Sequence, residues 1–170
     1  MAISLISAKR TGDDLAAGQV TASDQSLYLT ASFLIWIIPA YLFLFPAPRT
    51  TEPEFFWTVW LVELAVVLLF CSTGIGYCLR KCRVDPARNF LIDFSCLNAP
   101  VSLVTLLVVW GFYYVVEAAL ALAGVQSTRP YDMARLLASA GAVLLVFLRI
   151  GAHISRVATL RENVISRRRQ

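Results

Sequence analysis

The sequence predicts an all-α membrane protein, an up-down antiparallel bundle of four transmembrane helices with both the N- and C-termini cytoplasmic. Of the 170 residues, 58% are hydrophobic and 15% are charged, and the mean hydropathy is +0.68. Soluble domains have about 25% charged residues, so this composition indicates surface that faces lipid. Four apolar segments reach about 20 residues, the length that crosses hydrocarbon. Basic residues flank these segments more often on one side of the predicted membrane than on the other.

We expect three parts along the chain. A polar N-terminal segment precedes the transmembrane domain, and a basic amphipathic tail follows it. The polar segment covers residues 1–26, the transmembrane domain covers 27–154 with spans at about 27–45, 55–79, 99–124 and 131–154, and the tail covers 155–170.

A short loop joins the first two spans. The first span has no charged residue, and the second has only Glu63. Between them, Thr51 and Glu54 have the spacing of a capping box, and Pro53 suits the first turn of the helix that follows. Because a short loop joins helices of opposite direction, we expect antiparallel neighbours in an up-down bundle.

The third span follows a basic cytoplasmic loop. We expect residues 90–100, FLIDFSCLNAP, to lie along the membrane interface before the chain turns inward at Pro100. Gly124 marks the C-terminal end of the third helix. The fourth span is the least apolar, because only the 13 residues between Arg135 and Arg149 are uncharged. It still spans if both arginines extend toward the two interfaces.

Basic residues give the orientation. An even number of spans puts both termini and the middle loop on one side, and eleven basic residues lie there against three opposite, a bias typical of the cytoplasmic side. The eleven are Lys9, Arg10, Arg80, Lys81, Arg83, Arg88, Arg156, Arg161, Arg167, Arg168 and Arg169, and the three are Arg49, Arg129 and Arg135.

Two carboxylates, Glu63 and Glu117, lie within predicted spans, at similar depth in the outer half of the membrane. Burying a charge there costs a few kcal/mol, and no basic residue stands at their depth, since Arg149 is near the opposite face. One alternative is a neutral packing group that hydrogen-bonds Tyr, Ser or Thr of a neighbouring helix. The others are a proton or cation path that uses both acids, and a pairing with a basic residue of a partner subunit.

Four polar residues, Asp93, Asn98, Arg149 and His153, are predicted to gather at the cytoplasmic interface. We expect an ion pair between Asp93 and Arg149 there, because pairing lets both charges lie low in the membrane. A catalytic alternative makes Cys96 a nucleophile with His153 as its base, although nothing in the sequence indicates an activated thiol.

All four cysteines fall in the cytoplasmic half of the predicted topology, so we expect free thiols. Cys78 and Cys82 lie at i, i+4 beside a basic cluster, which makes them candidate lipidation sites in a eukaryotic source. With Cys96 and His153 they supply the ligand types of a zinc site, but not its usual spacing. Packing among apolar helices is the favoured explanation, and we expect no metal and no cofactor.

Two features predict partners. Ala134, Ala138 and Ala142 form a stripe of small residues on the fourth helix, which permits close packing inside one bundle or in a homo- or hetero-oligomer. The tail after 154 alternates apolar and basic residues at helical spacing, so we expect a helix that continues out of the membrane and binds anionic headgroups or a partner. Basic residues that flank spans do not indicate nucleic-acid binding.

The leading functional prediction is a small multi-pass integral membrane protein without catalysis of its own. It would act as a scaffold, an accessory subunit or a self-associating bundle, because no set of residues has ligand or nucleophile spacing. The second is an oligomeric proton or cation channel or transporter that uses Glu63 and Glu117. The third is a membrane enzyme acting on lipid or thiol.

Overall fold

The computed structural model describes residues 6–44, 53–82, 86–127 and 129–168, except for the side chains of 37–44, 53–56, 86–88, 165, 167 and 168. Within these ranges the chain forms five helices and no strand, which confirms the all-α class. The helices are α1 (Ala8–Ala16), α2 (Ala22–Leu44), α3 (Pro53–Lys81), α4 (Pro86–Leu122) and α5 (Arg129–Arg168).

Three of the helices are long and apolar enough to cross a membrane, as expected for a membrane protein. They contain the predicted second, third and fourth spans. The stretches are Trp57–Lys81 of α3, Asn89–Leu122 of α4 and Arg129–Val164 of α5. The predicted first span lies in α2, part of whose side chains are outside the described residues, so its membrane crossing stays a prediction.

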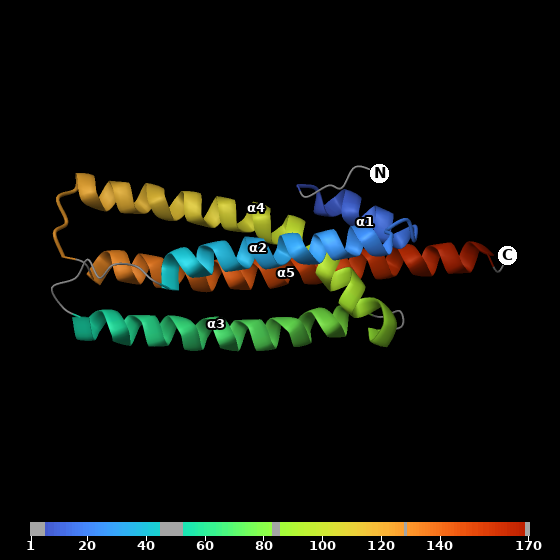
Figure 1. Cartoon of the computed structure of the whole chain (residues 1–170), viewed down its shortest axis with the longest axis horizontal. Helices are drawn as coiled ribbons and strands as arrows, with labels where there is room; N and C mark the ends of the chain where they lie inside the picture. Colours follow the sequence, from blue (N-terminus) through green and yellow to red (C-terminus); the bar gives the residue numbers. More distant parts are fainter. Residues whose placement is uncertain (1–5, 45–52, 83–85, 128, 169–170) are drawn as a thin grey trace.

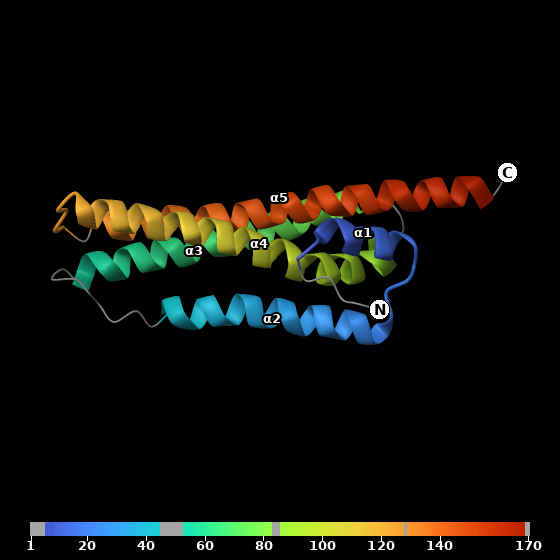
Figure 2. The ribbon, with the colours of Figure 1, turned by 90° about the horizontal axis from the view of Figure 1, so that it is seen from above.

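The long helices lie side by side and alternate in direction along the chain (Figures 1 and 2). We call the end that carries both chain termini the termini end, and the end with the turn between α4 and α5 the far end (Figure 1). α5 is the central helix, because α1, α3 and α4 all pack against it. α2 packs against α4.

The order of neighbours differs from the one expected for consecutive antiparallel helices. α3 and α4 meet at only a few positions, and the described residues show no packing of α2 on α3. Instead, α3 packs on α5 and α2 packs on α4, and the members of each pair run in the same direction (Figure 1). The first turns of α4 run obliquely and carry the chain away from α3, which explains why consecutive helices are not the main partners (Figure 1).

The segment expected along the interface is part of a continuous helix. α4 includes residues 90–100 and passes through Pro100, which is fully buried. Proline lacks an N–H and its ring clashes with the carbonyl four residues earlier, here that of Cys96, so a helix bends where proline lies inside it. The bend separates the oblique first part of α4 from the part that runs along the bundle (Figure 1).

Two glycines bring α3 and α5 into close contact. A Cβ built on Gly74 of α3 would lie 2.3 Å from the Phe147 ring of α5, and a Cβ on Gly151 of α5 would lie 2.3 Å from the Tyr77 ring of α3. Each helix therefore provides one glycine and one aromatic ring. Phe147 also stacks on Phe94 of α4, with ring centroids 6.2 Å apart, so α4 joins this contact as well.

The N-terminal segment, which was predicted only to be polar, contains a helix. α1 has Ser7 as its N-cap and buries Thr11 and Leu15 against the bundle. α2 begins at Ala22, earlier than its apolar part, because Thr21 and Asp24 cap it reciprocally. The side-chain and backbone hydrogen bonds from Thr21 hold the pKa of Asp24 below its usual value.

The connections are described only in part. α3 begins at Pro53, while Thr51 and the side chain of Glu54 lie outside the described residues, so the capping box stays a prediction. α4 ends at Leu122, and Gly124 has a φ of 72°, a left-handed conformation that favours glycine after a helix. Tyr131 then donates a hydrogen bond of 3.2 Å to the carbonyl of Val125 across the turn.

The far half of α4 is loosely packed. No residue from Leu107 to Ser127 is buried, whereas the half of α4 before Leu107 contributes Leu97, Val101 and their neighbours to the core. The core therefore lies toward the termini end, where α1, α2, α4 and α5 meet.

Replacing Gly74 by Ala should destabilise the protein by about 1–3 kcal/mol, because the buried Phe147 ring cannot move away without losing its own packing. Gly76→Ala is the matched control, since nothing lies within 4 Å of a Cβ there. It should be neutral or slightly stabilising, as alanine favours helix more than glycine. Thermal unfolding in detergent measures both; equal stability of the two variants would contradict the close α3–α5 contact.

Candidate functional site

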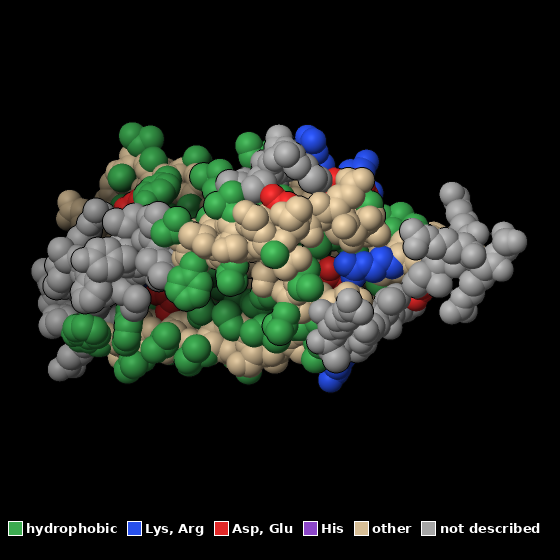
Figure 3. Space-filling model, turned by 45° about the vertical axis from the view of Figure 1, so that its right-hand side comes forward, with side chains coloured by type: hydrophobic (Ala, Val, Ile, Leu, Met, Phe, Trp, Pro, Cys, Tyr) green, Lys and Arg blue, Asp and Glu red, His purple; other side chains and the backbone are tan. Residues whose placement is uncertain are grey.

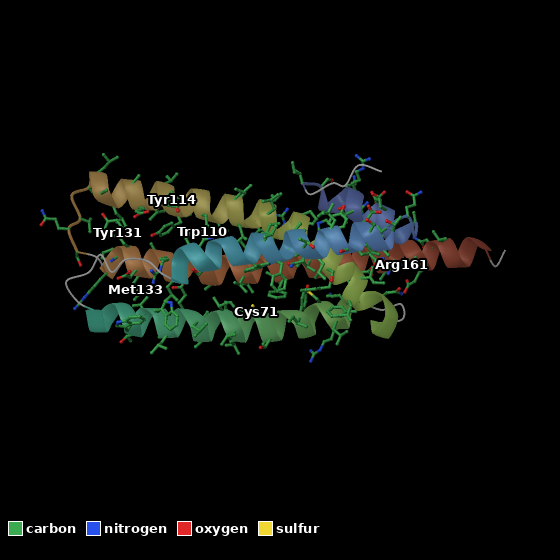
Figure 4. The ribbon with its side chains drawn as sticks, viewed as in Figure 1. Cys71, Trp110, Tyr114, Tyr131, Met133 and Arg161 are labelled. Carbon is green, nitrogen blue, oxygen red and sulfur yellow. The ribbon has the colours of Figure 1, made fainter. Side chains whose placement is uncertain are left out.

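A buried ion pair joins three helices at the termini end. Asp93 of α4, which is 1% exposed, accepts hydrogen bonds of 2.6 and 2.8 Å from the two terminal nitrogens of Arg161 on α5. Arg161 Nη2 also donates to the carbonyl of Leu15 in α1, at 3.3 Å. Bidentate pairs of this kind are strong and directional. Figure 4 shows Arg161 on the part of α5 nearest the C-terminus.

The expected pair between Asp93 and Arg149 does not form in the structure. Arg149 lies 12 positions before Arg161 on the same helix, about 18 Å along its axis. The antiparallel register of α4 and α5 instead places Arg149 beside Thr105, with 3.2 Å between Nη1 and Oγ1. Arg161, which the sequence analysis assigned to the C-terminal tail, is the residue that reaches Asp93.

The predicted polar cluster is divided among separate contacts. Asn98 Oδ1 accepts hydrogen bonds from Ser102 Oγ at 2.9 Å and from Trp36 Nε1 of α2 at 3.5 Å. It therefore fixes α2 on α4 near the bend at Pro100 rather than joining Asp93 or Arg149. His153 is half-buried on α5, one turn after Arg149.

A second ion pair, toward the far end, gives Glu63 a basic partner within the same chain. Arg135 Nη2 of α5 lies 3.3 Å from Glu63 Oε2 of α3, and Ser139 Oγ donates a hydrogen bond to Oε1. The Glu63 and Arg135 side chains are only 16% and 10% exposed. No basic residue was expected at this depth, because Arg135 was predicted to extend to the interface. The parallel packing of α3 on α5 brings Arg135 to the carboxylate.

Two further acids lie toward the same end. Asp132 is buried one turn before Arg135, and its Oδ2 accepts no hydrogen bond in the described structure. Glu117 is half-buried on α4. α3 and α4 meet at only a few positions, and a path that uses both Glu63 and Glu117 stays a prediction.

The cysteines face protein. All four are free thiols, and Cys78, Cys82 and Cys96 are buried, at 0%, 4% and 0% exposed. Cys78 Sγ donates a hydrogen bond of 3.5 Å to the Phe147 carbonyl of α5. Acylation of Cys78 or Cys82 would require the helices to separate, and a substrate cannot reach Cys96 in this arrangement. Among the described side chains, no three His, Cys, Asp or Glu residues gather as ligands for a metal ion.

The structure describes only part of the two predicted partner surfaces. Ala142 is buried, and Ala134 and Ala138 are half-buried, so this stripe contributes to packing within the chain; its use between copies stays a prediction. α5 continues through Arg168 as one helix, as expected of a helix that leaves the membrane. The side chains of Arg167, Arg168 and Arg169 lie outside the described residues.

Comparison with known proteins adds no relative: no family model, no curated protein and no solved structure matches this chain. The function must therefore be inferred from the residues and contacts described above.

Asp93→Asn should destabilise the protein by about 3–5 kcal/mol, because it leaves Arg161 without its counter-charge in a largely buried place. The matched control is Asp13→Asn, which removes the 2.7 Å ion pair between Asp13 and Arg156. The side chain of Asp13 is 46% exposed and that of Arg156 is 39% exposed. That pair contributes at most about 1 kcal/mol. Unfolding of both variants in the same detergent tests the difference, and a control as damaging as Asp93→Asn would contradict it.

Proposed function

We propose that the protein is a multi-pass membrane protein with four spans and cytoplasmic termini, acting as a non-catalytic scaffold, accessory subunit or self-associating bundle. The observation that carries this proposal is the pairing of Glu63. The carboxylate that looked most suited to transport is held by Arg135 and Ser139 of the same chain, at the contact between α3 and α5. A charged pair in this position fixes the register of two helices.

The surface supports the membrane part of the proposal. Large apolar side chains are exposed along all the long helices, among them Phe33, Leu68, Phe112 and Leu137. In Figure 3 hydrophobic side chains cover much of the visible face, while the visible Lys and Arg side chains gather toward the termini end. This asymmetry supports cytoplasmic termini, because basic residues remain on the cytoplasmic side during insertion.

A second candidate function is proton or cation conduction. It is favoured by the buried Oδ2 of Asp132, which lacks a hydrogen bond in the described structure, close to the Glu63–Arg135 pair. Acids inside a membrane frequently mark ion paths. Glu117 would be the third acid of such a path.

Glu63→Gln separates the two candidates. If Glu63 is a structural partner of Arg135, Gln retains a hydrogen-bond acceptor for Ser139 but removes the charge, so stability should fall while assembly survives. The wild-type protein, reconstituted in vesicles with a pH-sensitive dye, should show no proton flux. Flux in the wild type that Glu63→Gln and Glu117→Gln abolish, with the fold intact, would support conduction instead.

Cysteine labelling tests the orientation. A membrane-impermeant thiol reagent added outside intact cells should label Ser127→Cys, at the far end, and should not label Ser166→Cys, near the C-terminus. The wild type is the control, since its thiols are buried or half-buried. Labelling at 166 from outside would reverse the proposed topology.

Native mass spectrometry from lipid nanodiscs tests the scaffold proposal directly. A scaffold or self-associating bundle should appear with a defined number of copies, and an accessory subunit should appear with a different protein. A lone monomer from native membranes would contradict all three forms of the proposal.

A further inference from the structure

Arg149 differs from three other arginines of α5. Arg135, Arg156 and Arg161 each lie within 4 Å of a carboxylate, at 3.3, 2.7 and 2.6 Å. Arg149 has a single hydrogen bond, to the neutral hydroxyl of Thr105, and no ion pair within the described part of the chain. Arg149 is also exposed.

The surroundings of Arg149 combine apolar and basic surface. On its far-end side, the apolar side chains of Leu144, Leu145 and Leu148 are each 44–45% exposed. On its termini side, His153 follows one turn later and Arg156 about 10 Å further along the axis. In a membrane with cytoplasmic termini, Arg149 would lie where the hydrocarbon of the inner leaflet meets the headgroups.

A second helix adds positive charge at this level. α1 runs in the same direction as α5, because Gly12 lies beside Val157 and the carbonyl of Leu15 meets Arg161 (Figures 1 and 2). The first turn of α1 comes one turn before Gly12, and His153 comes one turn before Val157, so the first turn of α1 is level with His153. A helix N-terminus carries partial positive charge, and α1 adds the exposed Lys9 and Arg10 within its first turn.

The acids of α1 do not cancel this charge. Asp13 and Asp14 lie in the second turn, further toward the termini end, and Arg156 binds Asp13. Among the described residues no carboxylate pairs with the guanidinium of Arg149, so an anion from outside the chain can bind it.

We infer that Arg149, with Thr105 and the first turn of α1, binds the phosphate of an anionic phospholipid in the inner leaflet. The guanidinium of Arg149 donates hydrogen bonds to the phosphate, and Thr105 holds the arginine side chain against α4. One acyl chain lies along the exposed leucines of α5. A lipid is the ligand because only a lipid brings a phosphate and an apolar chain to this boundary together. The inference rests on the proposed membrane insertion.

The test is titration of the purified, delipidated protein with phosphatidylglycerol, with phosphatidylcholine as the reference, and native mass spectrometry to count bound lipid. The wild type should prefer phosphatidylglycerol. Arg149→Gln should weaken phosphatidylglycerol binding about fivefold or more, which corresponds to about 1 kcal/mol for a basic residue near the headgroups. Arg149→Lys should retain most of the binding.

Arg80→Gln is the matched control, because Arg80 is an exposed basic residue at the same end of the bundle but on α3. It should change binding less than twofold. Unchanged binding in Arg149→Gln, an equal loss in Arg80→Gln, or complete competition by free glycerol phosphate would each overturn the inference. So would loss of a co-purifying protein from Arg149→Gln while lipid binding stays unchanged.

Two further measurements keep the result interpretable. The thermal midpoint of each variant shows whether it folds, and Arg149→Lys keeps the charge if Arg149→Gln unfolds; Arg149→Lys that folds but does not bind phosphatidylglycerol overturns the inference. Carbonate extraction of native membranes tests insertion separately. A wild type released by carbonate contradicts the proposed function, whereas a retained wild type that does not prefer phosphatidylglycerol contradicts only the lipid site.

Discussion

The close contact between α3 and α5 is the interaction on which most of the other features depend. Between helices in a membrane, burial of apolar surface gives no net driving force, because lipid is as apolar as the side chains. Association then requires close van der Waals contact, and Gly74 and Gly151 make this possible by admitting the rings of Phe147 and Tyr77. The same contact brings Glu63 within reach of Arg135 and Ser139 and buries Cys78. α1 and α4 also pack on α5.

Basic residues along α5 pair with acids of the other helices. Toward the far end the partner is Glu63 of α3, and at the termini end the partners are Asp93 of α4 and Asp13 of α1. Each pair connects a different helix to α5, and the pairs of Glu63 and Asp93 satisfy groups that would be costly to bury alone. These contacts specify direction and register, which the apolar surfaces alone would leave open. Glu63 thus has a structural explanation that requires no ligand.

The fold class and the approximate positions of three apolar helices could be predicted from the sequence, because length and hydropathy decide both. The end of α4 at Gly124 could also be predicted, because it follows a local rule for glycine after a helix. The ion pairs could not, because they depend on which helices are neighbours. Arg161 was assigned to the tail and Arg135 to the interface, and only the register of α5 against α4 and α3 brings them to Asp93 and Glu63. The one local signal was that Asp93 and Glu63 are acids in apolar surroundings, for which a basic partner was one of the alternatives.

The bend at Pro100 has a consequence for how the molecule opens. Around it, α4 is packed among α1, α2 and α5; beyond Leu106, no described residue of α4 is buried. The free energy of local opening should therefore fall from the termini end to the far end, since few buried contacts oppose separation there. Backbone amides of α4 beyond Leu106 would exchange hydrogen sooner than those before Pro100 wherever water reaches them. The half of α4 beyond Leu106 can therefore tilt against its neighbours while the first half stays packed in the core.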